Sequence, residues 1–152
     1  MTIEAPVSKF RIRNLLIYII ALLAAAGWFA YDGFLNEKFI AEHTKDGKPD
    51  STLAINQIGP FVFLAAGAAL IAYLLILKKR KIVADDTGLI ISSKRAVPYD
   101  SIEKIDKTNF KDKGFFVITF KDALGNIQEI KLTDRKHDNL SAILERLIEK
   151  IS

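Results

Sequence analysis

Two long stretches without a single charged residue constrain this chain more than any other feature. They cover residues 14–31 and 51–77, whereas the 22 basic and 18 acidic side chains of the 152-residue chain all lie elsewhere. A helix rises about 1.5 Å per residue, so roughly 20 apolar residues cross the ~30 Å hydrocarbon core of a bilayer. We therefore expect two transmembrane helices, over residues 14–35 and 58–77, and one small domain outside the membrane.

Basic residues beside these stretches predict the orientation, because cytoplasmic flanks are rich in Lys and Arg. Three basic residues precede the first stretch and four consecutive ones follow the second, while the loop between them has five acids and three lysines. We expect a multi-pass protein of the cell inner (cytoplasmic) membrane, with residues 1–13 and 78–152 in the cytoplasm and loop 36–57 outside. The alternative is a cleavable signal peptide, since a basic start, an apolar run and Ala24–Ala26 fit that pattern too.

Small side chains lie in the middle of both stretches, where they let helices approach closely in lipid. We predict helix packing in the membrane through Ala26, Ala30, Gly67, Ala68 and Ala72. Either the two helices pack on each other, or part of this surface contacts another integral membrane protein or a second copy of the chain. Neither stretch contains an ionisable side chain, which disfavours a transporter.

The loop between the stretches is polar. Asp46–Gly47 predicts a turn, and Gly59–Pro60 predicts the start of the second helix, because proline is tolerated in a first turn. His43 lies near Glu42, Asp46 and Asp50, but their spacing matches no pattern of metal ligands. A solvated loop is the better interpretation.

From residue 82 onward, short apolar runs alternate with turns, and one amphipathic helix follows. We predict strands over 82–84, 89–91, 96–97, 102–110, 115–121 and 127–132. In the fifth of these, Phe116, Ile118 and Phe120 would form a buried face. The final helix should begin with Asp138 or Asn139 as its cap. Its apolar stripe contains Leu140, Ile143, Leu144, Leu147, Ile148 and Ile151.

The run IVADDTGLIISSKRAVPYDSIEKIDK, residues 82–107, combines a strand, an acidic turn with glycine, an Ile-rich strand, a basic turn and a Pro-aromatic-Asp step. It resembles the bacterial pleckstrin-homology-like (PH-like) domains of small membrane proteins, in which a pair of transmembrane helices also precedes the domain. The resemblance covers roughly residues 78–151. It implies an α+β membrane protein, with a two-helix transmembrane hairpin followed by a small antiparallel PH-like β-sandwich or barrel that a C-terminal α-helix caps.

Little in the chain indicates catalysis. It contains no cysteine, no GxSxG motif and no glycine-rich phosphate loop. In the expected topology His43 and His137 lie on opposite sides of the membrane. Ser141, His137 and Asp134 or Asp138 follow an order unlike that of known hydrolase triads. We therefore expect neither an enzyme nor a bound metal or cofactor.

Basic residues are the remaining signal, since residues 78–152 hold 16 Lys and Arg against 12 Asp and Glu. A cation near an anionic leaflet contributes about 1 kcal/mol. The turn at 85–88 has two carboxylates, which disfavour a phosphate there. In the rest of this domain the basic and acidic residues nearly balance, and no exposed aromatic residues that could stack on bases can be recognised. Both observations disfavour binding of nucleic acid. The better interpretation of the basic run at 78–81 is a stop-transfer flank beside the second membrane span. As a by-product we predict weak contact with anionic membrane lipids through Lys78, Lys79, Arg80, Lys81, Lys94 and Arg95.

Two functions follow as expectations. The first is a non-enzymatic interaction module, an accessory subunit or scaffold of a membrane protein complex, which would bind its partner through exposed sheet edges. The second is a sensor of anionic lipid that adds Lys107, Lys111 and Lys113, on nearby turns, to the basic residues above.

Overall fold

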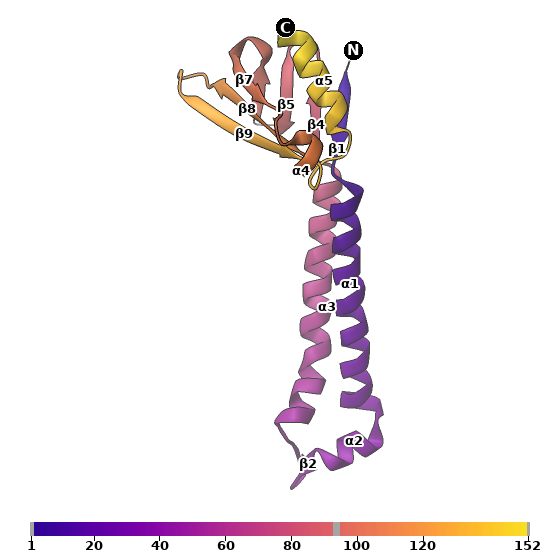
Figure 1. Ribbon diagram of the computed structural model, residues 1–152. Coiled ribbons are helices and arrows are strands. Elements are labelled where there is room, and N and C mark those ends of the chain that lie inside the picture. Colours follow the sequence, from indigo (N-terminus) through magenta and orange to yellow (C-terminus); the bar gives the residue numbers. More distant parts are fainter. Residues whose placement is uncertain (1, 93–94, 152) are drawn as a thin grey trace. The chain divides into compact units, whose positions relative to one another are not determined.

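A computed structural model describes residues 2–92 and 95–151 of the chain (Figure 1). The chain divides into two compact units. The first, Arg13–Leu75, is named here the helical hairpin. The second is built from the segments on either side of it, residues 2–12 and 76–151, and is named the β domain. Two long apolar helices and antiparallel sheets make the fold α+β, as predicted.

The helical hairpin consists of two long helices and a short connection. Asp46 and Gly47 have positive φ angles of 51° and 71° and form the predicted turn between two short strands. The elements are α1 (Lys9–Ala30), the π-helix η1 (Tyr31–Leu35), α2 (Glu37–Glu42), β2 (Thr44–Lys45), β3 (Lys48–Pro49) and α3 (Ser51–Lys78).

Helix α3 begins earlier than the sequence predicted. The side chain of Asp50 accepts hydrogen bonds from the backbone N–H groups of Thr52 (2.9 Å) and Leu53 (3.0 Å), which caps a helix that starts at Ser51. Pro60 therefore lies inside the helix, and the predicted start at Gly59–Pro60 was wrong. The cap lies within the polar loop, where no apolar periodicity marks a helix.

The buried positions on the two long helices recur every seven residues. This spacing is typical of two helices that pack side by side with a slight left-handed twist. The rings of Phe29 and Phe63 meet edge to face across the pair, with centroids 5.2 Å apart. Within the helical hairpin, the buried positions are Ile19, Ala26 and Gly33 in the first helical segment and Leu53, Pro60, Gly67 and Leu74 in the second; Leu77, at the end of α3, is buried in the β domain.

This seven-residue spacing places only some of the predicted packing residues in the contact. Ala26 and Gly67 are buried and Ala30 is half-buried, whereas Ala68 and Ala72 are exposed. Consecutive small residues point to every side of a helix, so their clustering could not indicate which side packs. Helix packing within a membrane stays a prediction for all five.

Gly33 brings the backbone of η1 against the backbone of α3. A Cβ atom at Gly33 would lie 2.6 Å from the carbonyl oxygen of Asn56, and the Gln57 side chain donates to the Gly33 carbonyl at 3.3 Å. Pro60 has no N–H to donate to that same Asn56 carbonyl. The backbone contact with Gly33 and the carbonyl group that Pro60 leaves without its helical hydrogen bond thus lie in the same turn of α3.

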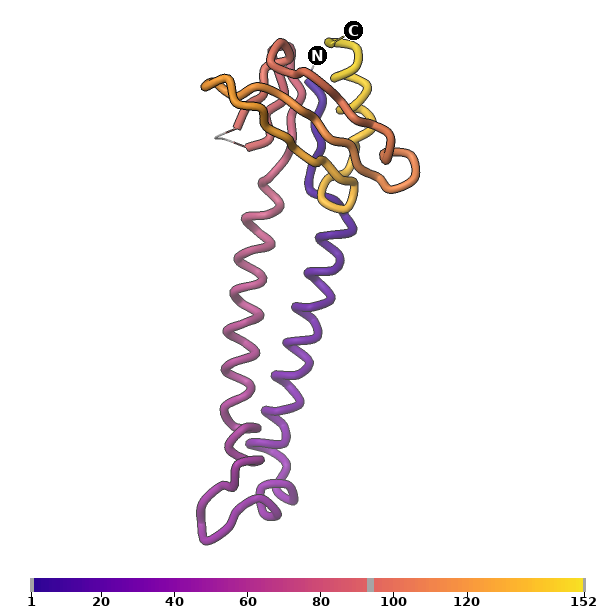
Figure 2. The backbone as a smooth tube through the Cα atoms, turned by 60° about the vertical axis from the view of Figure 1, so that its left-hand side comes forward, coloured from indigo at the N-terminus to yellow at the C-terminus, as the bar shows by residue number. Residues whose placement is uncertain are grey.

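The β domain contains two antiparallel sheets, a four-stranded one in the order β1-β4-β5-β6 and a three-stranded one in the order β7-β8-β9. Figure 2 follows the long orange hairpin of β8 and β9. The strands are β1 (Ile3–Pro6), β4 (Lys81–Ala84), β5 (Gly88–Ser92), β6 (Arg95–Pro98), β7 (Ile102–Asp106), β8 (Phe115–Lys121) and β9 (Ile127–Thr133), with helical segments η2 (Tyr99–Ser101), α4 (Phe110–Lys113) and α5 (Leu140–Ile151).

Strand β1 was not predicted, because its partner lies far away in the sequence. It pairs antiparallel with β4, so that Ile3 lies opposite Ala84 and Pro6 opposite Lys81. Ala5 is fully buried in the core of the β domain. A short alternation over five residues before an apolar helix carries no local signal of a sheet. Part of the N-terminal segment 1–13 is therefore an integral strand of the β domain.

The remaining strands largely follow the predictions. Phe116, Ile118 and Phe120 are buried on β8, as their alternation predicted. The predicted strand 102–110 is shorter, because β7 ends at Asp106 and the chain then turns into α4. Gly114 ends α4 with a φ of +66°, a conformation that glycine adopts without strain.

Helix α5 packs against β1 and β4 (Figure 1). Four residues of its predicted stripe, Leu140, Ile143, Leu144 and Leu147, are buried, whereas Ile148 is half-buried and Ile151 is exposed at the end of the helix. Its predicted caps bond elsewhere. The carboxylate of Asp138 accepts from the backbone N–H of Lys9 (3.1 Å), and the side chain of Asn139 donates to the carbonyl of Glu4 (2.9 Å). Both side chains thus hold the N-terminal segment, whose position in the fold no local pattern predicted.

Ala5→Glu should destabilise the β domain, because it buries an unpaired charge beside β4. We expect a loss of at least about 3 kcal/mol in the free energy of unfolding. The control is Glu4→Gln, which removes one exposed ion pair with Lys81 and should cost less than about 1 kcal/mol. Urea-dependent proteolysis of the detergent-solubilised full chain measures both. Equal stability of the two variants would contradict the assignment of β1 to the core.

Gly33→Ala should destabilise the helical hairpin by about 1–3 kcal/mol, since the new methyl group meets the backbone of Asn56. Gly27→Ala is the matched control on the same helical segment, because a Cβ atom there has nothing within 4 Å. It should leave stability unchanged or raise it by up to about 1 kcal/mol. Thermal unfolding in detergent, followed by circular dichroism, compares the two. A neutral Gly33→Ala would rule out the close backbone contact.

Candidate functional site

A pocket of about 860 Å³ opens in the β domain where distant segments of the chain meet. The segments are the first turn of α1, the junction of α3 with β4, strand β5, and the turn after β9. We name it the basic pocket. Its cations are Arg11, Lys79, Arg80, Lys81 and Lys136, its apolar floor is Val7, Leu77, Val83, Ile90 and Ile91, and Ser92 and His137 complete the lining.

Ser8 fixes two walls of the basic pocket relative to each other. This fully buried residue donates from its backbone N–H to the carbonyl of Lys136 (2.9 Å) and from its hydroxyl to the carbonyl of Arg135 (2.8 Å). The same hydroxyl accepts from the N–H of Arg11 (3.2 Å), which caps α1. Arg11 and Lys136 are thereby held at one site, although they are 125 positions apart in the sequence.

The opposite wall is set by the end of α3. The N–H groups of Lys79 and Arg80 donate to the carbonyls of Ile76 (3.2 Å) and Leu77 (2.9 Å), so the helix ends tightly just before β4. Lys81 forms an ion pair with Glu4 of β1. Within the described part of the chain, no Asp or Glu lines the basic pocket.

His137 lies in the wall that carries Lys136. Its Nδ1 atom is buried and has no hydrogen-bond partner among the described residues. Burial lowers the pKa of this imidazole below its ordinary value, and the nearby charges of Arg11 and Lys136 lower the pKa further. The basic pocket thus has a strong positive potential, and its floor is apolar. This combination suits a ligand that carries negative charge on an apolar body.

Comparisons with known proteins do not place the chain in a family. No family model, curated protein or solved structure matches it. The function of this chain is therefore inferred from its own residues and their contacts.

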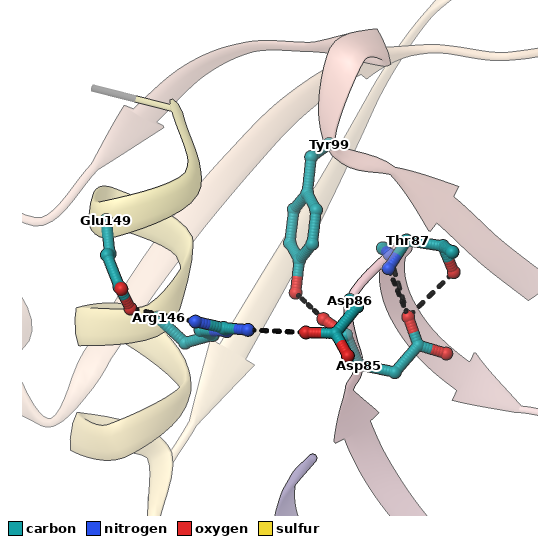
Figure 3. A network of polar contacts seen from close by, with 7 residues as sticks. Asp85, Asp86, Thr87, Tyr99, Arg146 and Glu149 are labelled. Atoms are coloured by element: carbon teal, nitrogen blue, oxygen red, sulfur yellow. Dashed lines mark hydrogen bonds and ion pairs between the residues drawn. The ribbon is translucent and has the colours of Figure 1, made fainter. Parts of the chain in front are cut away.

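The acidic turn between β4 and β5 has a structural role (Figure 3). One carboxylate oxygen of Asp85 accepts from the N–H and hydroxyl of Thr87, both at 2.7 Å, and from the N–H of Gly88 at 2.9 Å. These hydrogen bonds, that of the Thr87 hydroxyl above all, lower the pKa of Asp85. The Tyr99 hydroxyl donates to the Asp85 carbonyl (2.7 Å). The turn keeps its negative charge on the surface of the domain.

Arg146 connects this turn to α5 (Figure 3). Its guanidinium donates to Asp86 (2.8 Å) and to Glu149 (3.0 Å). The Arg146 side chain is largely covered, whereas both acids are exposed. Asp86 therefore holds α5 against the sheet.

The predicted lipid-contact residues are divided by the fold. Lys79, Arg80 and Lys81 line the basic pocket, and Lys78 is the last, exposed residue of α3. Arg95 lines a separate cleft of about 480 Å³, where its guanidinium lies 5.7 Å from the ring centroid of Phe120. Lys94 lies outside the described residues. Lys107, Lys111 and Lys113 follow β7 or belong to α4 and are not part of the basic pocket.

The sequence reasoning missed Arg11, Lys136 and His137 as members of this site. Arg11 counted only as a flank of the first apolar stretch, and Arg135–His137 is a basic run within a nearly balanced segment. The only sequence signal for these members of the basic pocket was the presence of two short basic runs, at residues 9–13 and 135–137. Their proximity depends on β1, which no local pattern indicated.

The outer connection contains a separate polar contact. The Nδ1 atom of His43 lies 2.9 Å from a carboxylate oxygen of Asp50. Bonds from the Leu53 N–H and from His43 lower the pKa of Asp50. Among the residues that the structure describes, no group of His, Asp and Glu side chains could hold a metal ion. His43 and Asp50 close the loop at the start of α3.

The low pKa of His137 predicts a pH-dependent stability. Below about pH 6.5 the unfolded chain binds a proton at this imidazole more readily than the folded chain does, so stability falls as the pH decreases through that range. His137→Asn should remove this contribution, whereas His43→Asn should retain it. Urea unfolding between about pH 7.5 and 5.5 tests the difference. An identical pH dependence in wild type and His137→Asn would refute it.

Proposed function

We propose that this chain is a non-enzymatic membrane protein of the inner (cytoplasmic) membrane. In this proposal, α1 with η1 and α3 cross the bilayer, and the β domain is a PH-like interaction module on the cytoplasmic side. Its best-defined interaction surface is the basic pocket, and the partner that this surface fits best is the anionic membrane itself.

The exposure of the helices supports a membrane location. Segments Lys9–Leu35 and Ser51–Lys78 are long and apolar enough to span a bilayer, and only 11% and 22% of their most apolar windows are buried. A core helix of a soluble protein would be mostly buried. A soluble helix pair would also carry charged side chains on its outer faces. Here the outer faces present large apolar residues, among them Leu16, Ile17, Ile20, Ile58, Phe61, Val62, Ile71 and Leu75.

The pairing of β1 with β4 is the main support for the proposed membrane topology, in which both ends of the helical hairpin lie on the same side of the bilayer. β1 ends at Pro6, shortly before α1, and β4 begins at Lys81, shortly after α3. Two strands of one sheet must lie in the same compartment, so the hairpin crosses the membrane an even number of times. The basic run at 78–81 then favours the cytoplasm for both ends.

The same pairing disfavours a cleaved signal peptide. Cleavage near Ala24–Ala26 would remove β1 and expose the edge of β4. It would also uncover the core around Ala5 and separate Arg11 from the basic pocket. An uncleaved N-terminal anchor is the better proposal.

The PH-like proposal is supported by the arrangement of the β domain. A four-stranded and a three-stranded antiparallel sheet with a helix at the C-terminal end agree with the split, helix-capped sheet that the resemblance implies. In this interpretation the helical hairpin is inserted between the first and second strands of the domain.

The basic pocket favours lipid contact over the other proposed roles. Cations beside an anionic leaflet contribute about 1 kcal/mol each. Four of the five cations that line the pocket, all except Lys136, lie within a few residues of the ends of α1 and α3 in the sequence. If these helices span the bilayer, chain connectivity keeps these four cations close to the membrane surface.

A second candidate function is binding of a protein partner, as an accessory subunit or scaffold. The tip of the β8–β9 hairpin favours it, because Leu124 is 87% exposed and Ile127 is 64% exposed. An integral membrane protein or a second copy of the chain would then cover this tip. Sizing and mass spectrometry of the chain purified in mild detergent would detect such a partner.

Reporter fusions test the proposed topology. A reporter inserted at Asp46 should respond as extracytoplasmic, and reporters at either terminus as cytoplasmic. The mature chain should retain the residues of β1, as measured by intact mass. Reporters at the two termini in different compartments, or a mass that indicates loss of the N-terminal segment, would overturn the proposal.

A further inference from the structure

The basic pocket has two chemically distinct halves. Arg11, Lys79, Arg80 and Lys136 supply cationic groups to its lining, and the partly buried side chains of Val83 and Ile90 belong to the apolar part of the lining, the floor. A small inorganic anion would satisfy the cationic groups and leave the floor exposed to water. An apolar body that continues from the anion would cover the floor and gain hydrophobic free energy. The pocket therefore fits an amphiphile better than a simple ion.

The charge of the lining indicates how much negative charge the ligand carries. Five cations and no described carboxylate line the pocket, and one of the cations, Lys81, pairs with Glu4 of β1. A phosphodiester headgroup brings one negative charge. A terminal phosphate monoester brings about −1.5 to −2 at pH 7 and three acceptor oxygens. The second charge and the additional acceptors favour a monoester among converging Arg and Lys side chains.

The way the cations are held favours one bound headgroup over diffuse attraction to a surface. Ser8 fixes Arg11 beside Lys136 through three hydrogen bonds, and the tight end of α3 fixes Lys79 and Arg80 opposite them. An Arg side chain can bind two phosphate oxygens at once, and Lys adds point charges. The backbone positions of these four residues are thus set before a ligand arrives, and only their side chains have to be ordered on binding, which reduces the entropy cost.

We propose that the basic pocket binds one lipid molecule through a terminal phosphate monoester, with Arg11, Arg80 and Lys136 on the phosphate and the adjacent apolar part of the lipid on Val83 and Ile90. This inference deepens the proposed function and depends on it, because a membrane lipid reaches the pocket only if the helical hairpin is embedded in the bilayer.

Competition between lipids tests the headgroup. The full chain in detergent is supplied with equimolar phosphatidic acid, phosphatidylglycerol and phosphatidylcholine of matched acyl chains, and retained lipids are counted by native mass spectrometry. We expect a single phosphatidic acid per chain, with a preference of about tenfold over phosphatidylglycerol. Equal retention of phosphatidic acid and phosphatidylglycerol would overturn the monoester assignment.

Two double variants of equal charge test the site. Arg80→Gln with Lys136→Gln removes two cations from the pocket, and Lys111→Gln with Lys113→Gln removes two from α4, outside it. All four side chains belong to exposed residues, so both variants should fold. The first pair should abolish the preference and the second should retain it. An equal loss of the preference for phosphatidic acid in both double variants would show that the lipid is attracted diffusely by surface charge, and it would overturn the inference.

Glycerol 3-phosphate separates a lipid from a soluble phosphate. It has the same monoester without acyl chains, and at equal concentration it should displace little phosphatidic acid. Equal competition would overturn the role of the apolar floor. As an independent readout, bound phosphatidic acid should raise the pKa of His137, measured by NMR, because it offsets the charges of Arg11 and Lys136. No change in that pKa would place the lipid elsewhere. The topology reporters are unaffected by these outcomes, so the proposed function and this inference can fail separately.

Discussion

The pairing of β1 with β4 is the contact on which the rest of the β domain depends. It joins residues from the two ends of a long helical insertion, and it brings Ala5 into the core with Ile82 and Ala84. Ser8, Asp138 and Asn139 extend this attachment by binding backbone groups between the N-terminal segment and the turn after β9. Removing β1 would therefore expose a sheet edge, open the core and separate the walls of the basic pocket at the same time.

The elements that the sequence predicted well are those with a strong local pattern. The alternation in β8 and the apolar stripe of α5 each indicate a buried face within one element. The face of β8 is buried as expected, and so are the first four residues of the stripe of α5. The two charge-free stretches at 14–31 and 51–77 likewise predicted the two long helices. The start of α3 was misplaced, because the cap at Asp50 lies in a polar segment and Pro60 gave the stronger signal. A residue such as Ala68, within a run of small residues, could not be assigned to a side of its helix without the partner.

The candidate site was only half predictable, for a related reason. Lys79, Arg80 and Lys81 form a continuous basic run that any composition analysis detects. Arg11 and Lys136 join them only because the four-residue strand β1 pairs with β4 and Ser8, just after it, bonds to the turn after β9. The low affinity for phosphate that its two carboxylates predict for the acidic turn stays a prediction. Asp85 bonds locally to Thr87, whereas the role of Asp86 depends on Arg146, 60 positions away in the sequence. Long-range contacts, which leave no local pattern, account for the missed part of the site.

The separation of β1 from its partner also determines the order in which the molecule can be assembled. Glu4 and Lys81, which form an ion pair across the two strands, are 77 positions apart, and both long helices are synthesised between them. The N-terminal strand therefore leaves the ribosome first and stays without its sheet until the last turn of α3 and the residues that follow have been made. Until then its apolar residues Ile3 and Ala5, and Val7 just after it, remain uncovered. The β domain can therefore be completed only after the whole intervening helical segment has been synthesised. The pairing of β1 with β4 is thus a late step in the biogenesis of the chain.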